Sequence, residues 1–472
     1  MIRRSLAILA ALFFVAAPLS LQAADSLTYP PAARSEVTDD YFGTKVADPY
    51  RWMEEIDSPQ TRAWVQAEAA LTNSYLSQLP HRDAIRNRLM ALANYEKTTL
   101  PTHERNTYIL SKNSGLQNHS VVYVSDGPDG PWRTLLDPNA LSTDGTVALG
   151  GGSLSRDGKL YAYSTQTAGS DWQTWHVRDV ASGNDLSDRI EWAKFSGASW
   201  NGDSTGFYYS AYDKPADSKL NIVNYNQKVY FHKVGTAQSA DWLVYARPDR
   251  KELFLTGRAL EDSQYLIISA GSGHTNGVYV LPEWRGNAAP VKEAVSDVYK
   301  VEPRELFAPG KASYSIVSAD GPTLFVETND GAPNSRLIAV DANDPAKVRV
   351  VIPESDVSLQ GVSSAGGRFF ARYLKDAYTL VRVYDRGGTL EREVTLPGIG
   401  TASGFGGRRD DTAVYYSFAG YTTPPTIYRY DIASGTSTVY SRPKVAFDPN
   451  AFTTEQIFFT SKDGTRVPMF LS

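Results

Sequence analysis

The chain has 472 residues, 42% of them hydrophobic, with 47 basic and 52 acidic side chains for a formal net charge of -5. This length and composition suffice for a large globular core and exclude a disordered or collagen-like chain. Because no long basic run is present, the charge pattern of a nucleic-acid-binding protein is absent. We therefore predict no nucleic-acid partner.

The side chains that usually hold metals or act as thiol nucleophiles are scarce. The sequence contains no cysteine, which excludes disulfides, cysteine zinc sites and thiolate catalysis. The six histidines stand far apart, with no pair at the helical spacing of a zinc motif, at positions 81, 103, 119, 176, 232 and 274. The sequence predicts no metal site and no cofactor.

The first 23 residues have the three regions of a secretory signal. Residues 1–4 include two arginines, residues 6–21 are almost entirely apolar, and Ala23 is a small residue ahead of a polar stretch. An uncleaved membrane anchor is the alternative, but the apolar run is short for a membrane span and no basic residues follow it. We expect cleavage after Ala23 and a periplasmic or secreted protein without a membrane segment.

Two helices are predicted after the signal. Ser58 precedes Pro59, which suits an N-cap followed by the first helical position, and apolar residues then recur at helical spacing as far as Leu79. A second, shorter helix is predicted around Ile85 and Leu89.

From about residue 95 a strand pattern repeats. A polar or glycine-containing turn precedes an alternating aromatic and aliphatic run, and a second strand follows each copy. The copies lie at residues 105–111, 157–164, 206–210, 263–269, 322–327, 368–372 and 412–417. Seven copies at a period of roughly 43 to 60 residues favour a seven-bladed β-propeller over unrelated hairpins in sandwiches.

The last thirty or so residues break this pattern. Two apolar strands flank the turn at Asp463 and Gly464, and such a hairpin cannot bury itself alone. We expect residues 443–472 to be the beginning of a further domain.

No catalytic constellation is visible in the sequence. A serine nucleophile elbow needs Gly-x-Ser-x-Gly, and the nearest matches, around Ser199 and Ser363, each lack the second glycine. The glycines at 150–152 lack the Lys-Ser/Thr of a phosphate loop. The turn at 169–172 places Asp171 beside Trp172, for which a structural turn is the simpler interpretation.

Several phrases resemble the prolyl oligopeptidase family of serine peptidases, from about Tyr29 to Ser472. They are Asp-Pro-Tyr-Arg-Trp-Met-Glu at 48–54, Thr-Asp-Gly-Thr-Val-Ala-Leu at 143–149, Gly-Ser-Asp-Trp at 169–172, Asn-Gln-Lys-Val-Tyr-Phe-His at 226–232 and Thr-Ser-Lys-Asp-Gly-Thr-Arg-Val-Pro-Met-Phe at 460–470. The first and last phrases are specific, whereas the blade repeats alone would fit many propellers.

The resemblance implies a mainly β chain whose seven-bladed propeller follows a short helical segment of an incomplete α/β-hydrolase domain. The implied parts are a signal peptide at 1–23, the helical segment of the peptidase domain at 24–94, the propeller at 95–442 and the start of the catalytic domain at 443–472. The catalytic serine, aspartate and histidine of the family would lie in the later part of that domain. No triad residue is therefore assigned.

The implied function is a serine endopeptidase that cleaves short peptides after proline, with the propeller limiting substrate access. Phe195 matches a family aromatic of the substrate pocket, and Asp171 matches an acid that contacts a basic residue of the peptidase domain. Val244 stands where a pocket cysteine can occur, so the outer subsites depart from the family pattern. The resemblance implies a monomer when the protein is complete, and no catalytic activity for this chain alone.

Two alternatives stay open at the sequence level. The chain could be a secreted propeller that acts alone as a binding or scaffolding module, or part of a related oligopeptidase specific for basic residues. A Gly-x-Ser-x-Gly region in further sequence would favour the enzyme.

Overall fold

The computed structural model describes residues 27–214, 224–261, 263–283 and 303–472. The chain divides into two compact units, residues 1–86 and 87–472, and each is described by itself. The signal peptide predicted at residues 1–23 lies outside the described residues. Within them, no helix combines the length and the apolar character needed to cross a membrane.

The first unit contains a hairpin and a helix. Strands β1 (Thr38–Tyr41) and β2 (Thr44–Ala47) pair antiparallel, and helix α1 (Pro59–Ser77) follows a 3₁₀ turn at Arg51–Glu54. The Ser58 hydroxyl accepts a hydrogen bond from the Thr61 backbone N–H at 3.1 Å, so the predicted N-cap is confirmed. Helix α2 (Arg82–Ala93), also predicted, runs across the boundary between the units.

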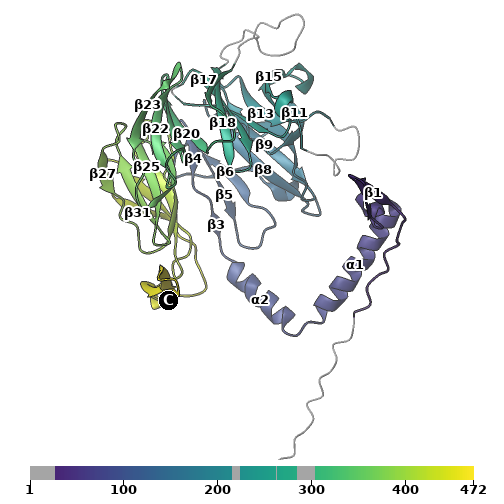
Figure 1. Cartoon of the computed structure of the whole chain (residues 1–472). Helices are drawn as coiled ribbons and strands as arrows, with labels where there is room; N and C mark the ends of the chain where they lie inside the picture. Colours follow the sequence, from purple (N-terminus) through teal and green to yellow (C-terminus); the bar gives the residue numbers. More distant parts are fainter. Residues whose placement is uncertain (1–26, 215–223, 262, 284–302) are drawn as a thin grey trace, which may run out of the picture. The chain divides into compact units, whose positions relative to one another are not determined.

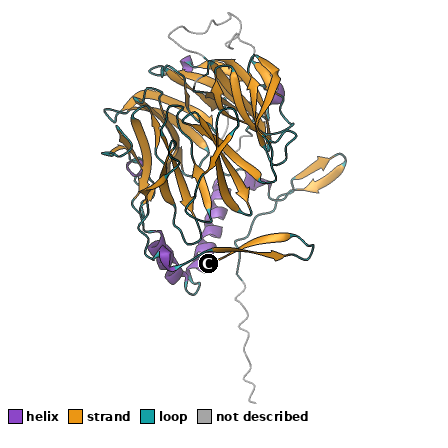
Figure 2. Cartoon of the chain, turned by 90° about the vertical axis from the view of Figure 1, so that its left-hand side faces the viewer, coloured by secondary structure: helices purple, strands orange, loops and turns teal. Residues whose placement is uncertain are grey.

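The second unit is built almost entirely of antiparallel strands, as the colouring of Figure 2 shows. Its first sheet has five strands: β3 (Lys97–Thr98), β4 (Thr102–Glu104), β5 (Thr107–Asn113), β6 (Val121–Ser125) and β7 (Arg133–Leu136). The next sheet has eight strands: β8 (Val147–Leu154), β9 (Leu160–Thr167), β10 (Trp172–Asp179), β11 (Asp185–Lys194), β12 (Ser199–Trp200), β13 (Gly206–Ala211), β14 (Lys228–Lys233) and β15 (Trp242–Ala246).

Four four-stranded sheets follow in chain order (Figure 1). The first two contain β16 (Phe254–Ala259), β17 (Tyr265–Ser272), β18 (Thr275–Pro282) and β19 (Arg304–Phe307), then β20 (Tyr314–Asp320), β21 (Thr323–Thr328), β22 (Arg336–Asp341) and β23 (Asp344–Ile352). The last two contain β24 (Ser358–Ala365), β25 (Arg368–Lys375), β26 (Tyr378–Tyr384) and β27 (Leu390–Glu393), then β28 (Thr401–Gly404), β29 (Ala413–Ala419), β30 (Thr426–Asp431) and β31 (Ser437–Ser441). A terminal hairpin joins β32 (Glu455–Thr460) and β33 (Arg466–Leu471).

The prediction of a seven-bladed propeller is wrong in its number of blades. Among the described residues, five sheets have the size of a blade, four with four strands and one with five, and one continuous sheet has eight strands. The repeat count missed this because β11 runs on to pair with β13 through Ala193 and Ala211. Both alanines are buried, and their small side chains let the two strands approach. The sequence pattern locates hairpins but does not say which sheet edges join.

The predicted α/β-hydrolase component is not seen either. The described residues contain two α-helices, α1 and α2, and a two-stranded terminal hairpin, whereas such a domain needs a larger sheet covered by helices. The predicted propeller boundaries at 95 and 442 stay predictions. They lie close to the first and last strands of the sheets, since β3 begins at Lys97 and β31 ends at Ser441.

Apolar packing between neighbouring sheets holds the second unit together. One buried cluster joins β13–β15 to β16–β18, the next joins β17–β19 to β20–β22, and the series continues through β24–β26 to β28–β30. The largest fully buried side chains are aromatic, among them Trp175, Tyr208, Phe325 and Phe370. Consecutive sheets therefore pack face to face through these clusters, the arrangement of a β-propeller.

A buried network of charged side chains lies where β11 pairs with β13. His232 on β14 is fully buried and places Nε2 2.8 Å from Asp188 Oδ1 and Nδ1 2.7 Å from Asp241 Oδ1. The Tyr209 hydroxyl donates to the other oxygen of Asp241 at 2.7 Å. Burial acts to lower the pKa of His232, but the hydrogen bonds to the two carboxylates raise it to about 9. The imidazolium therefore links β11 to β14 where the β11–β13 ladder is short.

This network predicts an alkaline loss of stability. Because the pKa of His232 is raised above its unfolded value of about 6.5, the stabilisation is complete below that pH and is lost as pH rises through about 9. We expect the free energy of unfolding to fall by on the order of 3 kcal/mol across this window. Urea unfolding measured from pH 6.5 to 9.5 tests this.

His232→Gln should lower stability at pH 6.5 and flatten this alkaline decline. His176→Gln is the matched control, because burial lowers the pKa of that half-buried histidine in the same sheet and its stability contribution is therefore lost toward acid pH. A wild-type stability that stays level between pH 6.5 and 9.5 would contradict the assignment.

Candidate functional site

An aromatic patch lies where the beginning of β10 and the end of β11 approach the beginning of β16. We define it as Trp172, Trp192, Phe195, Tyr212 and Phe254, which surround Lys194. Phe195 and Phe254 are exposed, at 47% and 41% of their surface. Exposed aromatic side chains beside a cation are typical of sites that bind ligands with apolar and polar parts.

The rings of the patch meet edge to face. The centroids of Trp172 and Trp192 are 6.0 Å apart at 77°, and those of Trp172 and Tyr212 are 6.0 Å apart at 83°. Phe195 meets Phe254 at 5.7 Å and 74°. These contacts hold the exposed rings in defined orientations, so the patch is formed before any ligand binds.

Lys194 contacts both groups of rings in the patch, the group around Trp172 and the pair of phenylalanines that includes Phe195. Its Nζ lies 5.2 Å from the ring centroids of both Trp172 and Phe195, within the range of a cation–π contact. The same amine is 3.8 Å from a carboxylate oxygen of Asp171. The acid predicted to contact the peptidase domain therefore has a basic neighbour within the propeller, and its 60% exposed side chain keeps surface for a further contact.

The backbone of the patch is strained at two aromatic residues. Trp192 and Phe195 have φ of 62° and 53°, the left-handed region that bulky residues seldom adopt. Such strain persists only where surrounding contacts enforce it, and it is concentrated at functional sites.

Two buried glutamines enforce that conformation. Gln227 donates from Nε2 to the Lys194 carbonyl at 2.8 Å and accepts from the Leu255 backbone N–H at 2.7 Å. Gln173 accepts from the Ser196 backbone N–H at 3.2 Å. Both glutamines are more than nine-tenths buried. Their amides supply hydrogen-bond partners for backbone groups at the end of β11 and in the turn that follows it.

Sequence reasoning named Phe195 and Asp171, and the structure brings them together around Lys194. Sequence reasoning missed Lys194 and Trp192 on β11 and Phe254 on β16. A possible signal was the pair of glutamines within apolar strand patterns, because a buried amide needs partners on neighbouring strands. Val244, noted as a departure in the outer subsites, is buried at 5% exposure.

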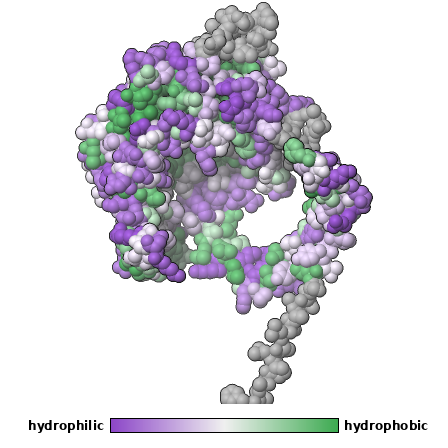
Figure 3. Space-filling view, in the orientation of Figure 1, coloured by the Kyte–Doolittle hydropathy of each residue, from purple (hydrophilic) through white to green (hydrophobic). Residues whose placement is uncertain are grey.

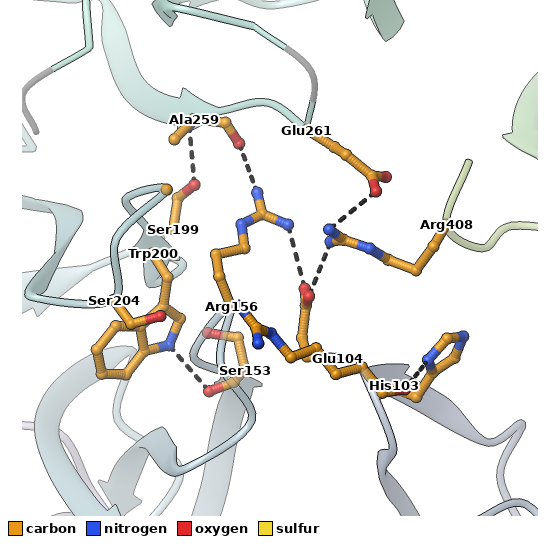
Figure 4. A network of polar contacts seen from close by, with 12 residues as sticks. His103, Glu104, Ser153, Arg156, Ser199, Trp200, Ser204, Ala259, Glu261 and Arg408 are labelled. Atoms are coloured by element: carbon orange, nitrogen blue, oxygen red, sulfur yellow. Dashed lines mark hydrogen bonds and ion pairs between the residues drawn. The ribbon is translucent and has the colours of Figure 1, made fainter. Parts of the chain in front are cut away.

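A second feature is a central cavity of about 660 Å³. Its walls include β4 and the first strands of the four four-stranded sheets, β16, β20, β24 and β28. Arg156 and Arg408 both contact Glu104, at 3.1 and 2.8 Å, and Arg408 also contacts Glu261 at 2.8 Å (Figure 4). Burial raises the pKa of Glu104 while the two guanidinium groups oppose that rise.

The serines closest to a nucleophile motif have structural roles. Ser199 Oγ accepts from the Ala259 backbone N–H at 3.0 Å (Figure 4), and Ser363 Oγ donates to the Gly404 carbonyl at 3.3 Å. The glycines at 150–152 lie inside strand β8. Within the described ranges no group of three or more histidine and acidic side chains could hold a metal ion.

Successive sheets packed around a central cavity, with an aromatic patch on the surface, define a β-propeller protein. A family model described as "Prolyl oligopeptidase, N-terminal beta-propeller domain" matches residues 30–443. The chain therefore belongs to the prolyl oligopeptidase family, as the sequence phrases predicted.

Relatives support this membership over most of the chain. The prolyl endopeptidase of Elizabethkingia miricola is 40% identical over 462 residues, covering 97% of this chain and 63% of the relative. Prolyl oligopeptidase A of Galerina marginata is 30% identical over 486 residues, covering 94% and 64%. A solved structure of prolyl oligopeptidase B from the same fungus, bound to a 35mer hydrolysis and macrocyclization substrate, has a TM-score of 0.81 at 30% identity and covers 94% of this chain and 64% of its own.

The chain thus spans less than two thirds of the length of these relatives. The relatives' names describe peptidases and, for the solved structure, a peptide substrate bound to that protein. The family model that this chain matches describes an N-terminal β-propeller domain.

Gln227 offers a test of how the patch is held. Gln227→Ala should leave the Lys194 carbonyl and the buried Leu255 N–H without their partner and cost about 1–3 kcal/mol. Urea unfolding followed by tryptophan fluorescence measures the loss. Gln360→Ala is the control, since that exposed amide bonds only Ser358 and should change stability by less than about 0.5 kcal/mol. Equal effects of the two substitutions would contradict the role given to Gln227.

Proposed function

We propose that this chain is the propeller-bearing portion of a prolyl oligopeptidase that cleaves short peptides after proline. Family membership, the peptidase names of the relatives and the peptide-bound neighbour support this proposal. The observation that carries it is the aromatic patch, because preformed exposed rings can pack against the apolar pyrrolidine of proline. In this proposal Phe195 lines the substrate pocket from the propeller side.

The remaining roles follow from the same proposal. Asp171, beside Lys194, provides a charged contact toward the peptidase domain. The propeller limits access to the active site, so short peptides enter and folded proteins do not. The 472 residues contain no Gly-x-Ser-x-Gly motif, so we propose that this chain by itself binds peptides without hydrolysing them.

Peptide titration tests the role of Phe195. A short blocked peptide containing Gly-Pro should change the fluorescence of Trp172 and Trp192 in the patch. Phe195→Ala should weaken binding by about 5- to 30-fold, the effect of losing an aromatic contact worth about 1–2 kcal/mol. The control is Phe447→Ala, at an equally exposed phenylalanine of the same unit (45%), which should bind as the unsubstituted chain does.

Two outcomes would contradict the proposal. Equal affinity of the Phe195→Ala and unsubstituted chains would remove Phe195 from the pocket. Release of product from a chromogenic Gly-Pro substrate, or labelling of a serine by a fluorophosphonate probe, would show that the chain is itself catalytic. Binding of folded proteins in preference to short peptides would favour the scaffolding alternative.

We also propose that the protein is exported, because of the signal pattern in residues 1–23. Expressed with its own N-terminus in a Gram-negative host, the protein should be recovered from the periplasm beginning at Ala24, within one residue. N-terminal sequencing of the soluble protein checks this. Recovery with Met1 or Ile2 at the N-terminus would contradict export.

A further inference from the structure

The central cavity is lined by more basic than acidic side chains, and the proposed peptidase function gives this positive charge no role. Six arginines line it: Arg156, Arg258, Arg386, Arg408, Arg409 and Arg429. Three carboxylates line it among the described residues: Glu104, Glu261 and Asp411. The whole chain is acidic, with a net charge of -5, so this excess of cations is a local property. The hollow between the sheets in Figure 3 is also coloured largely as hydrophilic.

Most of these arginines already have carboxylate partners. Arg156 and Arg408 share Glu104, and Arg408 also pairs with Glu261 (Figure 4). Arg386 pairs with Asp320 at 3.0 Å, and Arg409 reaches the same aspartate. These pairs neutralise much of the cavity wall and hold its arginines in place.

Arg258 differs from its neighbours. It stands on β16, the strand of its sheet that faces the cavity, and donates from one guanidinium nitrogen to the Ile316 backbone carbonyl at 3.0 Å. No carboxylate of the described residues forms an ion pair with it. Its side chain is exposed and lines the cavity. Desolvation by the surrounding protein and the nearby Arg156 lower the pKa of Arg258.

Arg258 and the nearby Arg156 carry like charges that repel each other, and an anion bound between them would relieve that repulsion. Ser315 lines the same cavity and directly precedes Ile316, whose carbonyl accepts from Arg258. Guanidinium groups bind planar carboxylates and phosphates through paired N–H donors, and a hydroxyl adds a further donor. The cavity volume of about 660 Å³ lies within the range of small-molecule sites.

We propose that the central cavity binds a small multivalent oxyanion at Arg258, with Arg156 and the Ser315 hydroxyl completing the site. The ligand class is a phosphate or a polycarboxylate that fits inside the propeller. This site is separate from the aromatic patch, and its anion bridges strands of different sheets. Occupancy therefore stabilises the folded propeller by mass action.

The oxyanion can come from two sources, a free small anion or the acidic side chains of a short peptide. The experiment uses the 472-residue chain and three probes: inorganic phosphate, citrate, and a blocked peptide of three glutamates. Isothermal titration measures affinity at constant ionic strength, with chloride as the balancing ion. We expect at least one probe to bind and its affinity to fall as ionic strength rises. Binding of phosphate or citrate identifies a free anion, and binding of the peptide alone identifies an acidic peptide.

Arg258→Met keeps much of the aliphatic volume and removes the charge, and it should weaken binding at least tenfold. Ser315→Ala should weaken it about three- to tenfold, and it provides a second variant if Arg258→Met folds poorly. Arg189→Met is the matched control, because Arg189 is exposed, pairs with Glu191 and does not line the cavity. That variant should bind as the unsubstituted chain does.

The proposal is overturned if none of the three probes binds the unsubstituted chain, or if Arg258→Met and Ser315→Ala bind with unchanged affinity. Phe195→Ala distinguishes this site from the proposed peptide site. Normal oxyanion binding by Phe195→Ala, whatever its effect on proline peptides, is the expected result. Loss of oxyanion binding in Phe195→Ala would mean that the anion sits at the aromatic patch, which also overturns the proposal.

Discussion

Burial of aromatic and branched apolar side chains between neighbouring sheets is the constraint on which this structure depends. Four of the buried clusters take residues from two consecutive sheets, so these sheets cover one another's apolar faces. Covering both faces of every sheet arranges the sheets around an axis. The first strands of the four-stranded sheets then face the centre, where residues of β16 and β20 meet those of β4 in one cavity.

Polar side chains complete this packing where the backbone ladders end. At the seam of the eight-stranded sheet, His232 links Asp188 and Asp241. At the aromatic patch, Gln227 bonds the backbones of both Lys194 and Leu255. A buried polar group is costly unless it has partners, so each of these side chains fixes the strands that supply those partners. The support of the patch is therefore part of the core of the propeller.

The first and last sheets meet through side chains. His103 of β4 lies 3.0 Å from a carboxylate oxygen of Asp411, which precedes β29, and the Tyr440 hydroxyl of β31 donates to the Pro128 carbonyl at 2.7 Å. Burial acts to lower the pKa of His103, but its hydrogen bond to Asp411 raises it overall. No strand is shared between these two sheets in the described part of the chain. Side-chain contacts therefore join the last sheet to the first.

The sequence by itself determined the local elements and the family. The Ser58 cap, both α-helices and the seven hairpin repeats follow from capping and alternation, which depend on residues close together in the chain. The specific phrases at 48–54 and 460–470 identified the family. Only the tertiary structure decided that β11 pairs with β13 through Ala193 and Ala211, because alternation marks strands but not the edges that join. It also decided that Phe254 packs on Phe195, and that Arg258 lines the cavity without a carboxylate partner among the described residues. These residues are far apart in the chain, and their meeting depends on how successive sheets bury their faces.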